Sequence, residues 1–257
     1  MDDAPPRQAE GLVVIRSAER FVSRREGITT WHSFSFGDHY DPDNVSFGPL
    51  VAFNEELLEP GAGYAVHEHR DLDIVTWVVE GTLAHEDPEG RRVTVTNGTV
   101  QRLTAGNGVR HSEVNAGGPG ESLRLVQLWF RPGADGDAVT PSYETWTLDE
   151  KDDRFGFTTV AASGTPRGSA TLSVPGVRVR VGHLVRGSTV QYGTGARGTQ
   201  AWQLYVAGGR LDSRELGPLG AGDAVRSLGR AGPGLRLLSI DDAVVLTVEL
   251  DEVPTGR

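Results

Sequence analysis

Four side chains of the kinds that bind transition metals stand in two short patterns, His67-x-His69 and His111-Ser112-Glu113. Both patterns adjoin runs of strand-forming residues. Side chains alternate between the two faces of an extended strand, so residues two apart point the same way. His67 therefore shares a face with His69, and His111 shares a face with Glu113. The strands and turns between the patterns can carry the chain out and back, which would bring three imidazoles and one carboxylate together as a first-row transition-metal site.

The composition narrows the ligands and partners of such a site. The chain of 257 residues contains no cysteine, which excludes thiolate ligands and leaves histidine and carboxylate. Its formal net charge is -10, from 25 basic and 35 acidic residues. Such a surface repels phosphate backbones and anionic lipids, so we expect no direct binding to nucleic acid or membranes. We find no signal-peptide pattern and no apolar run near the ~20 residues that span a bilayer, and we expect a cytoplasmic monomer.

Two blocks of short strands are predicted to surround the site. Hydrophobic residues at 37%, with 34 Gly and 14 Pro, are typical of a turn-rich β protein. We predict a disordered start at 1–10, a first barrel with the metal site at 11–134, a connector at 135–168 and a second barrel at 169–257. Strands are predicted in the first block at 12–15, 29–36, 50–54, 64–69, 74–79, 82–85, 92–96, 100–103, 109–114 and 123–130. In the second block they are predicted at 176–185, 188–192, 201–207, 210–216, 223–228, 234–240 and 243–250.

Several motifs together resemble one family. Gly61-x5-His67-x-His69 followed by Gly81 resembles the first motif of the cupin superfamily, and Gly98-x5-Thr104-x-Gly106 followed by His111 resembles its second motif in altered form. The alteration is similar to the pirin family in particular. So are three further segments: His32-Ser33-Phe34-Ser35-Phe36, Phe47-Gly48-Pro49-Leu50 and Ile74-Val75-Thr76-Trp77-Val78-Val79-Glu80-Gly81. The resemblance is close over residues 31–130 and weak afterwards.

Pirins are bicupins, so the resemblance implies an all-β fold of two tandem jelly-roll-like cupin barrels with one metal in the first. It implies His67, His69, His111 and Glu113 as the ligands. The family usually binds iron, which implies Fe(II), with Zn, Ni, Cu, Mn and Co as other divalent candidates. This sequence departs from the family at Glu68 and Asp71, where Pro and Gly are common. Glu68 should face away from the histidines, whereas Asp71 should alter the pocket rim and with it the choice of substrate.

Three functions are compatible with four protein ligands, which leave coordination positions open for chemistry. Several bacterial pirins open the flavonol quercetin with O2, so the first is a dioxygenase acting on small phenolic substrates, in which Glu113 takes the proton of the substrate hydroxyl. Animal pirin is an iron-dependent transcriptional co-regulator, so the second is a non-enzymatic regulatory module with a protein partner. The third is a redox-neutral cupin enzyme. We rank them in this order. All three stay open, because a fold alone does not fix the reaction.

Two nearby residues compete with the predicted ligands. Asp73 lies near the position of the carboxylate ligand in ordinary cupins and has the same strand parity as the histidine pair, but we favour Glu113. His85 has the parity to face the barrel interior, yet its neighbours form a polar hairpin. We therefore predict that His85 is a hydrogen-bonded structural residue and not a ligand.

The remaining histidines and the large aromatic residues have plainer interpretations. His32 and His39 are not expected to bind metal. His183 is the only histidine of the second block, which predicts a second barrel without metal. Trp77, Trp129 and Phe130 are predicted to fill the core, with the alternative that one of them lines a substrate pocket.

Overall fold

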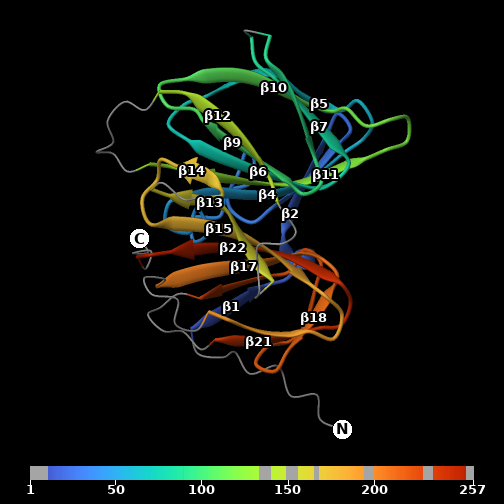
Figure 1. The fold of residues 1–257 in the computed structure, drawn as a ribbon, viewed down its shortest axis with the longest axis vertical. Coiled ribbons are helices and arrows are strands. Elements are labelled where there is room, and N and C mark those ends of the chain that lie inside the picture. Colours follow the sequence, from blue (N-terminus) through green and yellow to red (C-terminus); the bar gives the residue numbers. More distant parts are fainter. Residues whose placement is uncertain are drawn as a thin grey trace. The chain divides into compact units, whose positions relative to one another are not determined.

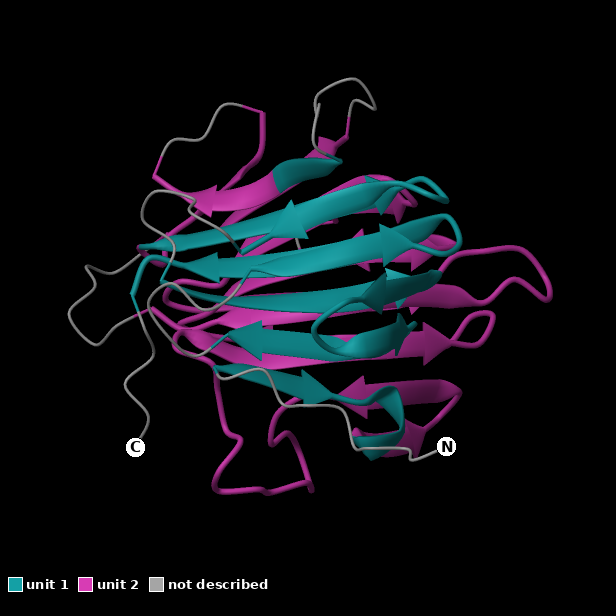
Figure 2. Cartoon of the chain, turned by 90° about the horizontal axis from the view of Figure 1, so that it is seen from below, with its two compact units in different colours: residues 1–19, 150–159, 176–257 teal, residues 20–149, 160–175 magenta. Residues whose placement is uncertain are grey.

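The chain forms two compact units in a computed structural model that describes residues 11–88, 90–132, 140–148, 156–164, 168–193, 200–227 and 234–252. Unit 1 comprises Met1–Glu19, Glu150–Thr159 and Gly176–Arg257, and unit 2 comprises Arg20–Asp149 and Val160–Pro175 (Figure 2). The predicted disordered start at 1–10 and the predicted boundary at 134–135 lie outside the described residues.

Unit 2 contains two antiparallel sheets that face each other across one interior (Figure 1). The larger sheet has the strand order β12-β9-β6-β11-β4-β3-β2, and the smaller has the order β5-β10-β7-β8. The strands of the larger sheet are β2 (Phe21–Arg25), β3 (Ile28–His32), β4 (Leu50–Leu58), β6 (Asp73–Glu80), β9 (Thr99–Thr104), β11 (Leu123–Phe130) and β12 (Ser142–Thr147). Those of the smaller sheet are β5 (Gly63–His69), β7 (Thr82–Glu86), β8 (Arg92–Thr96) and β10 (Val109–Asn115).

The inward side chains of unit 2 change from apolar to polar along single strands. On β11, Leu123 and Leu125 belong to an apolar cluster with Leu83 and Val95 of the smaller sheet. The next inward residue, Gln127, instead donates a hydrogen bond across the interior. A second apolar cluster is centred on Leu72, Ile74, Leu103 and Ala105. The two apolar clusters hold the sheets together by the hydrophobic effect. Polar side chains such as Gln127 lie in the interior between these clusters.

Unit 1 has the same plan of a larger and a smaller sheet. Its larger sheet runs β1-β20-β17-β22-β15 and continues into the start of β13, and its smaller sheet has the order β16-β21-β18-β19. Its strands are β1 (Leu12–Ile15), β15 (Val177–Leu184), β16 (Thr189–Tyr192), β17 (Ala201–Gly208), β18 (Arg210–Ser213), β19 (Gly217–Gly220), β20 (Ala224–Ser227), β21 (Leu235–Ser239) and β22 (Ala243–Leu250). A short 3-10 turn, η1 (Ser17–Glu19), follows β1.

The predicted all-β fold with two cupin barrels is confirmed. Two segments, however, belong to other parts of the fold than the sequence predicts. β1 falls within the range of the first barrel, yet it pairs with β20 and buries Leu12 in the apolar cluster of unit 1. The range of the connector contains β12, which extends the larger sheet of unit 2, and β13 (Phe157–Ser163). The end of β13 pairs in parallel with β14 (Ala170–Leu172). Within the described residues, no helix is long and apolar enough to cross a membrane.

Candidate metal centre

The two histidine patterns lie on neighbouring antiparallel strands. His67 and His69 are on β5 and His111 is on β10, with His67 directly opposite His111 and His69 opposite Val109. A β-bulge between His111 and Glu113 shifts the pairing there. Gly63, near the bulge, has no room for a side chain, because a Cβ would collide with the backbone oxygen of Glu113. The smaller sheet thus carries all three imidazoles. The extra residue of the bulge lies on β5, so β10 keeps its alternation and Glu113 shares a face with His111.

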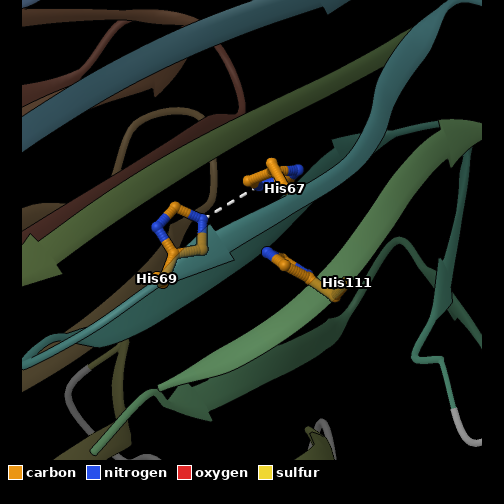
Figure 3. A group of neighbouring side chains, drawn as sticks. All are labelled: His67, His69 and His111. Carbon is orange, nitrogen blue, oxygen red and sulfur yellow. Dashed lines mark hydrogen bonds between the residues drawn. The ribbon is translucent and has the colours of Figure 1, made fainter. Parts of the chain in front are cut away.

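The three imidazoles turn their nitrogens toward a common space (Figure 3). One potential ligand atom from each of His67, His69 and His111 lies within 4.8 Å of the others. The Nε2 atoms of His67 and His69 are 2.9 Å apart. Two nitrogens bound to one ion at about 2.0–2.1 Å, at right angles to each other, would have nearly this separation. Three of the four predicted ligands are therefore together.

Two of the inward nitrogens, His67 Nε2 and His69 Nε2, are hydrogen-bonded to each other, and the third, on His111, is unpaired. His67 Nδ1 lies 2.8 Å from the carbonyl oxygen of Ala65, to which it can only donate, so Nε2 presents its lone pair to the cluster. His111 Nε2 is buried and has no hydrogen-bond partner. Buried polar atoms are normally paired, and an unpaired ring nitrogen beside two other imidazoles suits a metal ion. The residues present fit such an ion.

Burial in the cluster keeps the rings of His69 and His111 neutral. Burial, with repulsion from His67, lowers the pKa of His69 to about 4, against the opposing attraction of Glu113. Burial also lowers the pKa of His111 to about 3, again with the Glu113 carboxylate opposing and the neighbouring imidazoles adding to the effect. Neutral imidazole is the form that binds metals, so near pH 7 these two rings need lose no proton before they bind an ion.

Glu113 is a buried carboxylate at the centre of a hydrogen-bond network. Gln101 Nε2 donates to its Oε1 at 2.7 Å, and Gln127 Nε2 donates to its Oε2 at 2.8 Å. Each glutamine is fixed in turn, because Tyr143 Oη donates to Gln101 Oε1 and Trp129 Nε1 donates to Gln127 Oε1.

These donors decide the charge of Glu113. Burial alone would raise the pKa of this carboxyl. The neighbouring imidazoles of His85 and His111 and the hydrogen bond from Gln101 outweigh burial and lower the pKa to about 2. Glu113 is therefore ionised, and its side chain is held in a fixed orientation.

His85 is hydrogen-bonded, as predicted, but it also lies among the predicted ligands. It lies on β7 opposite Glu113, is only 2% exposed, and groups with His111 and Glu113 as possible ligands. Its Nδ1 is 3.2 Å from His111 Nδ1 and 3.8 Å from Glu113 Oε1. Glu113 is thus grouped with His85 and His111, whereas His67 and His69 form the other group around His111. The alternation of side chains along the strand already indicates that His85 faces the barrel interior.

The competing residues have other partners. Asp73 is fully buried, and Thr104, Ser173 and Val174 donate hydrogen bonds to its two oxygens. Asp73 therefore anchors the segment after β14 within unit 2 and is not among the grouped residues. The other histidines are also outside those groups: His32 bonds to Ser23 and Asn54, His39 stacks on Phe21, and His183 lies on β15 in unit 1.

The large aromatic residues divide between core and site. Trp77 and Phe130 are buried in the core, at 1% and 0% exposure, as predicted. Trp129 instead packs its ring against His69, with the ring centroids 4.9 Å apart. Since its Nε1 also holds Gln127, Trp129 connects the imidazole cluster to the carboxylate network.

Known proteins resemble this chain in both sequence and fold. Residues 15–130 match the family model named Pirin. A pirin-like protein of Caulobacter vibrioides is 30% identical over 86% of this chain and 87% of its own length. The chain belongs to the pirin family. A Mycobacterium tuberculosis relative, provisionally named quercetin 2,3-dioxygenase, is 39% identical over 82% of this chain and 84% of its own length.

Solved pirins resemble this chain over nearly its whole length. The bacterial pirin YhhW from Escherichia coli, in complex with nickel(II), has a TM-score of 0.81 and 26% identity and covers 93% of this chain and 98% of its own.

A further sequence relative, an E. coli protein named quercetin 2,3-dioxygenase, is 38% identical over 54% of this chain and 59% of its own length. Pirin homologues thus include a metal-bound protein, and this chain contains a His/Glu site.

This pirin's two departures from the family pattern lie beside the site. Glu68 is exposed and pairs with Arg70 at 3.0 Å, so it faces away from the imidazoles as predicted. Asp71 has a φ of 54°, in the left-handed region that favours glycine. Asp is among the few other residues that tolerate this region, which accounts for Asp where pirins often have Gly.

Proposed function

We propose that this pirin is a metal-dependent dioxygenase that opens flavonol-type phenols with O2, as in quercetin 2,3-dioxygenase. His67, His69, His111 and Glu113 would hold one divalent metal, for which we propose Fe(II). The observation that carries the proposal is the buried, unpaired Nε2 of His111 next to two further imidazoles. The names of the relatives indicate the substrate class.

The donor set suits redox chemistry at an open site. Three neutral imidazoles and one carboxylate leave a net charge of +1 on a divalent ion and occupy four of five or six coordination positions. When bound, such an ion would supply one-electron chemistry with O2 and make a coordinated phenol more acidic. The protein's own contribution is to orient the donors and exclude water.

Glu113 is proposed to accept the proton of the substrate hydroxyl. Gln101 and Gln127 favour its ionised form, so it can take up a proton at neutral pH. Glu113 is also a weak base, since His85, His111 and Gln101 together lower its pKa to about 2. Proton transfer to Glu113 therefore requires a substrate hydroxyl that is much more acidic in the complex than a free phenol.

The proposal is tested by aerobic incubation of iron-loaded protein with quercetin, with O2 uptake and the ring-opened product both measured. We expect turnover by the parent and by His183→Ala, a control on β15 far along the chain from the site, and at least a hundredfold less by His67→Ala. Equal product from the parent and from His67→Ala would reject the proposal. Equal turnover with Zn(II) and Fe(II) would instead indicate that the metal acts as a Lewis acid without changing its own oxidation state.

A further inference from the structure

A second polar feature of unit 2 lies outside the metal centre. A cavity of about 280 Å³ opens between β2, β3, β4 and β5 and the loop after β3. Its walls include Phe21, Thr30, His32, Phe36, Glu56 and Tyr64. This volume is near the lower end of the roughly 300–1,000 Å³ typical of small-molecule sites. It can accommodate one part of a ligand, such as a single ring with its substituents.

The cavity has a buried carboxyl group in its wall. Glu56 is only 4% exposed, and its Oε2 has no hydrogen-bond partner. Tyr64 and Thr30 line the cavity together with Glu56. Burial and the nearby charge of Glu113 raise the pKa of Glu56 to about 8, although the neighbouring Tyr64 opposes this. At neutral pH Glu56 is therefore mostly a neutral acid that can both donate and accept.

The rest of the wall is aromatic. The rings of His32 and Phe36 are stacked with centroids 5.4 Å apart, and Phe21 lies 5.7 Å from His32. Flat, apolar faces of this kind bind planar rings by burial of area and by offset stacking. An aromatic ring that carries a hydroxyl matches both parts of the cavity, the stacked faces and the buried acid.

Two ring contacts connect the cavity wall to the imidazole cluster. Tyr64 lies against His67, with ring centroids 5.9 Å apart. Phe36 lies 5.1 Å from Trp129, which in turn lies 4.9 Å from His69. The cavity wall is therefore in direct contact with the imidazole cluster, which places the cavity beside the proposed metal.

We infer that this cavity binds the remote ring of the phenolic substrate and that Glu56 and Tyr64 select a neutral hydroxyl on that ring. This inference rests on the proposed function for the identity of the substrate class. A hydroxyl entering the cavity would supply the missing partner of Glu56. The carboxyl group has only to turn about its last torsion, which has a broad, nearly two-fold profile. Glu56 and Tyr64 act here as specificity-determining residues for the substrate.

The charges around the cavity favour a neutral substituent over an anionic one. A carboxylate on the ligand would approach Glu56 and the ionised Glu113, and its desolvation would not be offset by a buried cation. Arg24 and Arg25 also line the cavity, but both are exposed, and Arg25 pairs with Asp38. The selected class is therefore uncharged phenols with a hydroxyl on the ring remote from the reacting end.

The test compares binding of two flavonols that differ by one hydroxyl on the remote ring. Dissociation constants are measured by titration calorimetry on metal-loaded protein without O2, so that binding is read without turnover. We expect the parent to prefer the hydroxylated flavonol by roughly five- to tenfold. Tyr64→Phe and Glu56→Leu should lose this preference, Glu56→Gln should retain part of it, and Tyr40→Phe, an exposed tyrosine, should retain all of it.

The outcomes separate this inference from the proposed function. Equal binding of the two flavonols by the parent, or an unchanged preference in both Tyr64→Phe and Glu56→Leu, would overturn the inference while leaving the dioxygenase proposal standing. Loss of the preference in these variants would support it even if no ring opening were detected. Melting temperatures establish that each variant is folded. If Glu56→Leu does not fold, the test depends on Tyr64→Phe, which removes only one oxygen atom.

Discussion

Replacement of Gln127 by leucine should weaken metal binding without removing any proposed ligand. Gln127 Nε2 donates at 2.8 Å to the Glu113 carboxylate, and its own oxygen accepts from Trp129. A hydrogen bond to a charged group contributes about 1.5–3 kcal/mol. Its loss should lower the acid dissociation constant of Glu113 roughly 10- to 100-fold, because the ionised form loses a donor. Since the carboxylate also loses its orientation, we expect metal affinity to fall roughly 10- to 100-fold.

Both quantities can be measured independently. Competition with a chromophoric chelator gives the affinity for Ni(II) or Fe(II) at pH 7, and carbon NMR of labelled glutamate in metal-free protein gives the titration of Glu113. Gln101→Leu removes the donor on the opposite oxygen and should act in the same direction. Gln191→Leu, at an exposed position of β16, is the control. If both site variants fold and bind metal as tightly as the parent, the assignment of Glu113 as a ligand is wrong.

Two further predictions concern the neighbours of this network. In the folded protein Glu56 should keep its proton up to about pH 8, whereas in the unfolded chain it loses the proton near pH 4.5. The stability that the protonated carboxyl group provides is therefore lost as pH rises from 4.5 to 8. Relative to Glu56→Gln, the parent's free energy of unfolding in urea should therefore fall by roughly 1 kcal/mol per pH unit between pH 5 and 8, and a constant difference would contradict the raised pKa. His85→Phe should keep the fold but lower metal affinity roughly tenfold in the chelator assay, because His111 Nδ1 loses its partner, whereas His39→Phe should not.

The sequence could predict which residues share a face, because strand parity is a local property. His67 and His69, and likewise His111 and Glu113, follow the alternation of β5 and β10. The long apolar run of β6 also predicted a strand buried on both faces, and its first six residues are buried. These inferences need only the two-residue period of a strand.

Pairing between distant strands could not be predicted in the same way. His85 was assigned a structural role because its neighbours in the chain are polar, yet β7 pairs with β10 and places it opposite Glu113. Gln101 and Gln127 are ordinary residues in strand sequences. They become carboxylate donors only because β9 and β11 face β10 across the barrel interior. The bulge beside Glu113 is likewise a property of the pair β5 and β10 and not of either strand alone.

The unsatisfied buried atoms connect the two proposals. A buried donor or acceptor without a partner costs about 1–3 kcal/mol, and a bound ligand can offset that cost. Most polar groups around Glu113 are paired, whereas His111 Nε2 and Glu56 Oε2 are both unpaired. These atoms differ in chemistry: a neutral ring nitrogen suits a cation, and a neutral carboxyl suits a hydroxyl. Bound metal should therefore stabilise the protein through His111 in a Glu56→Leu variant as well, which makes the two sites separable by experiment.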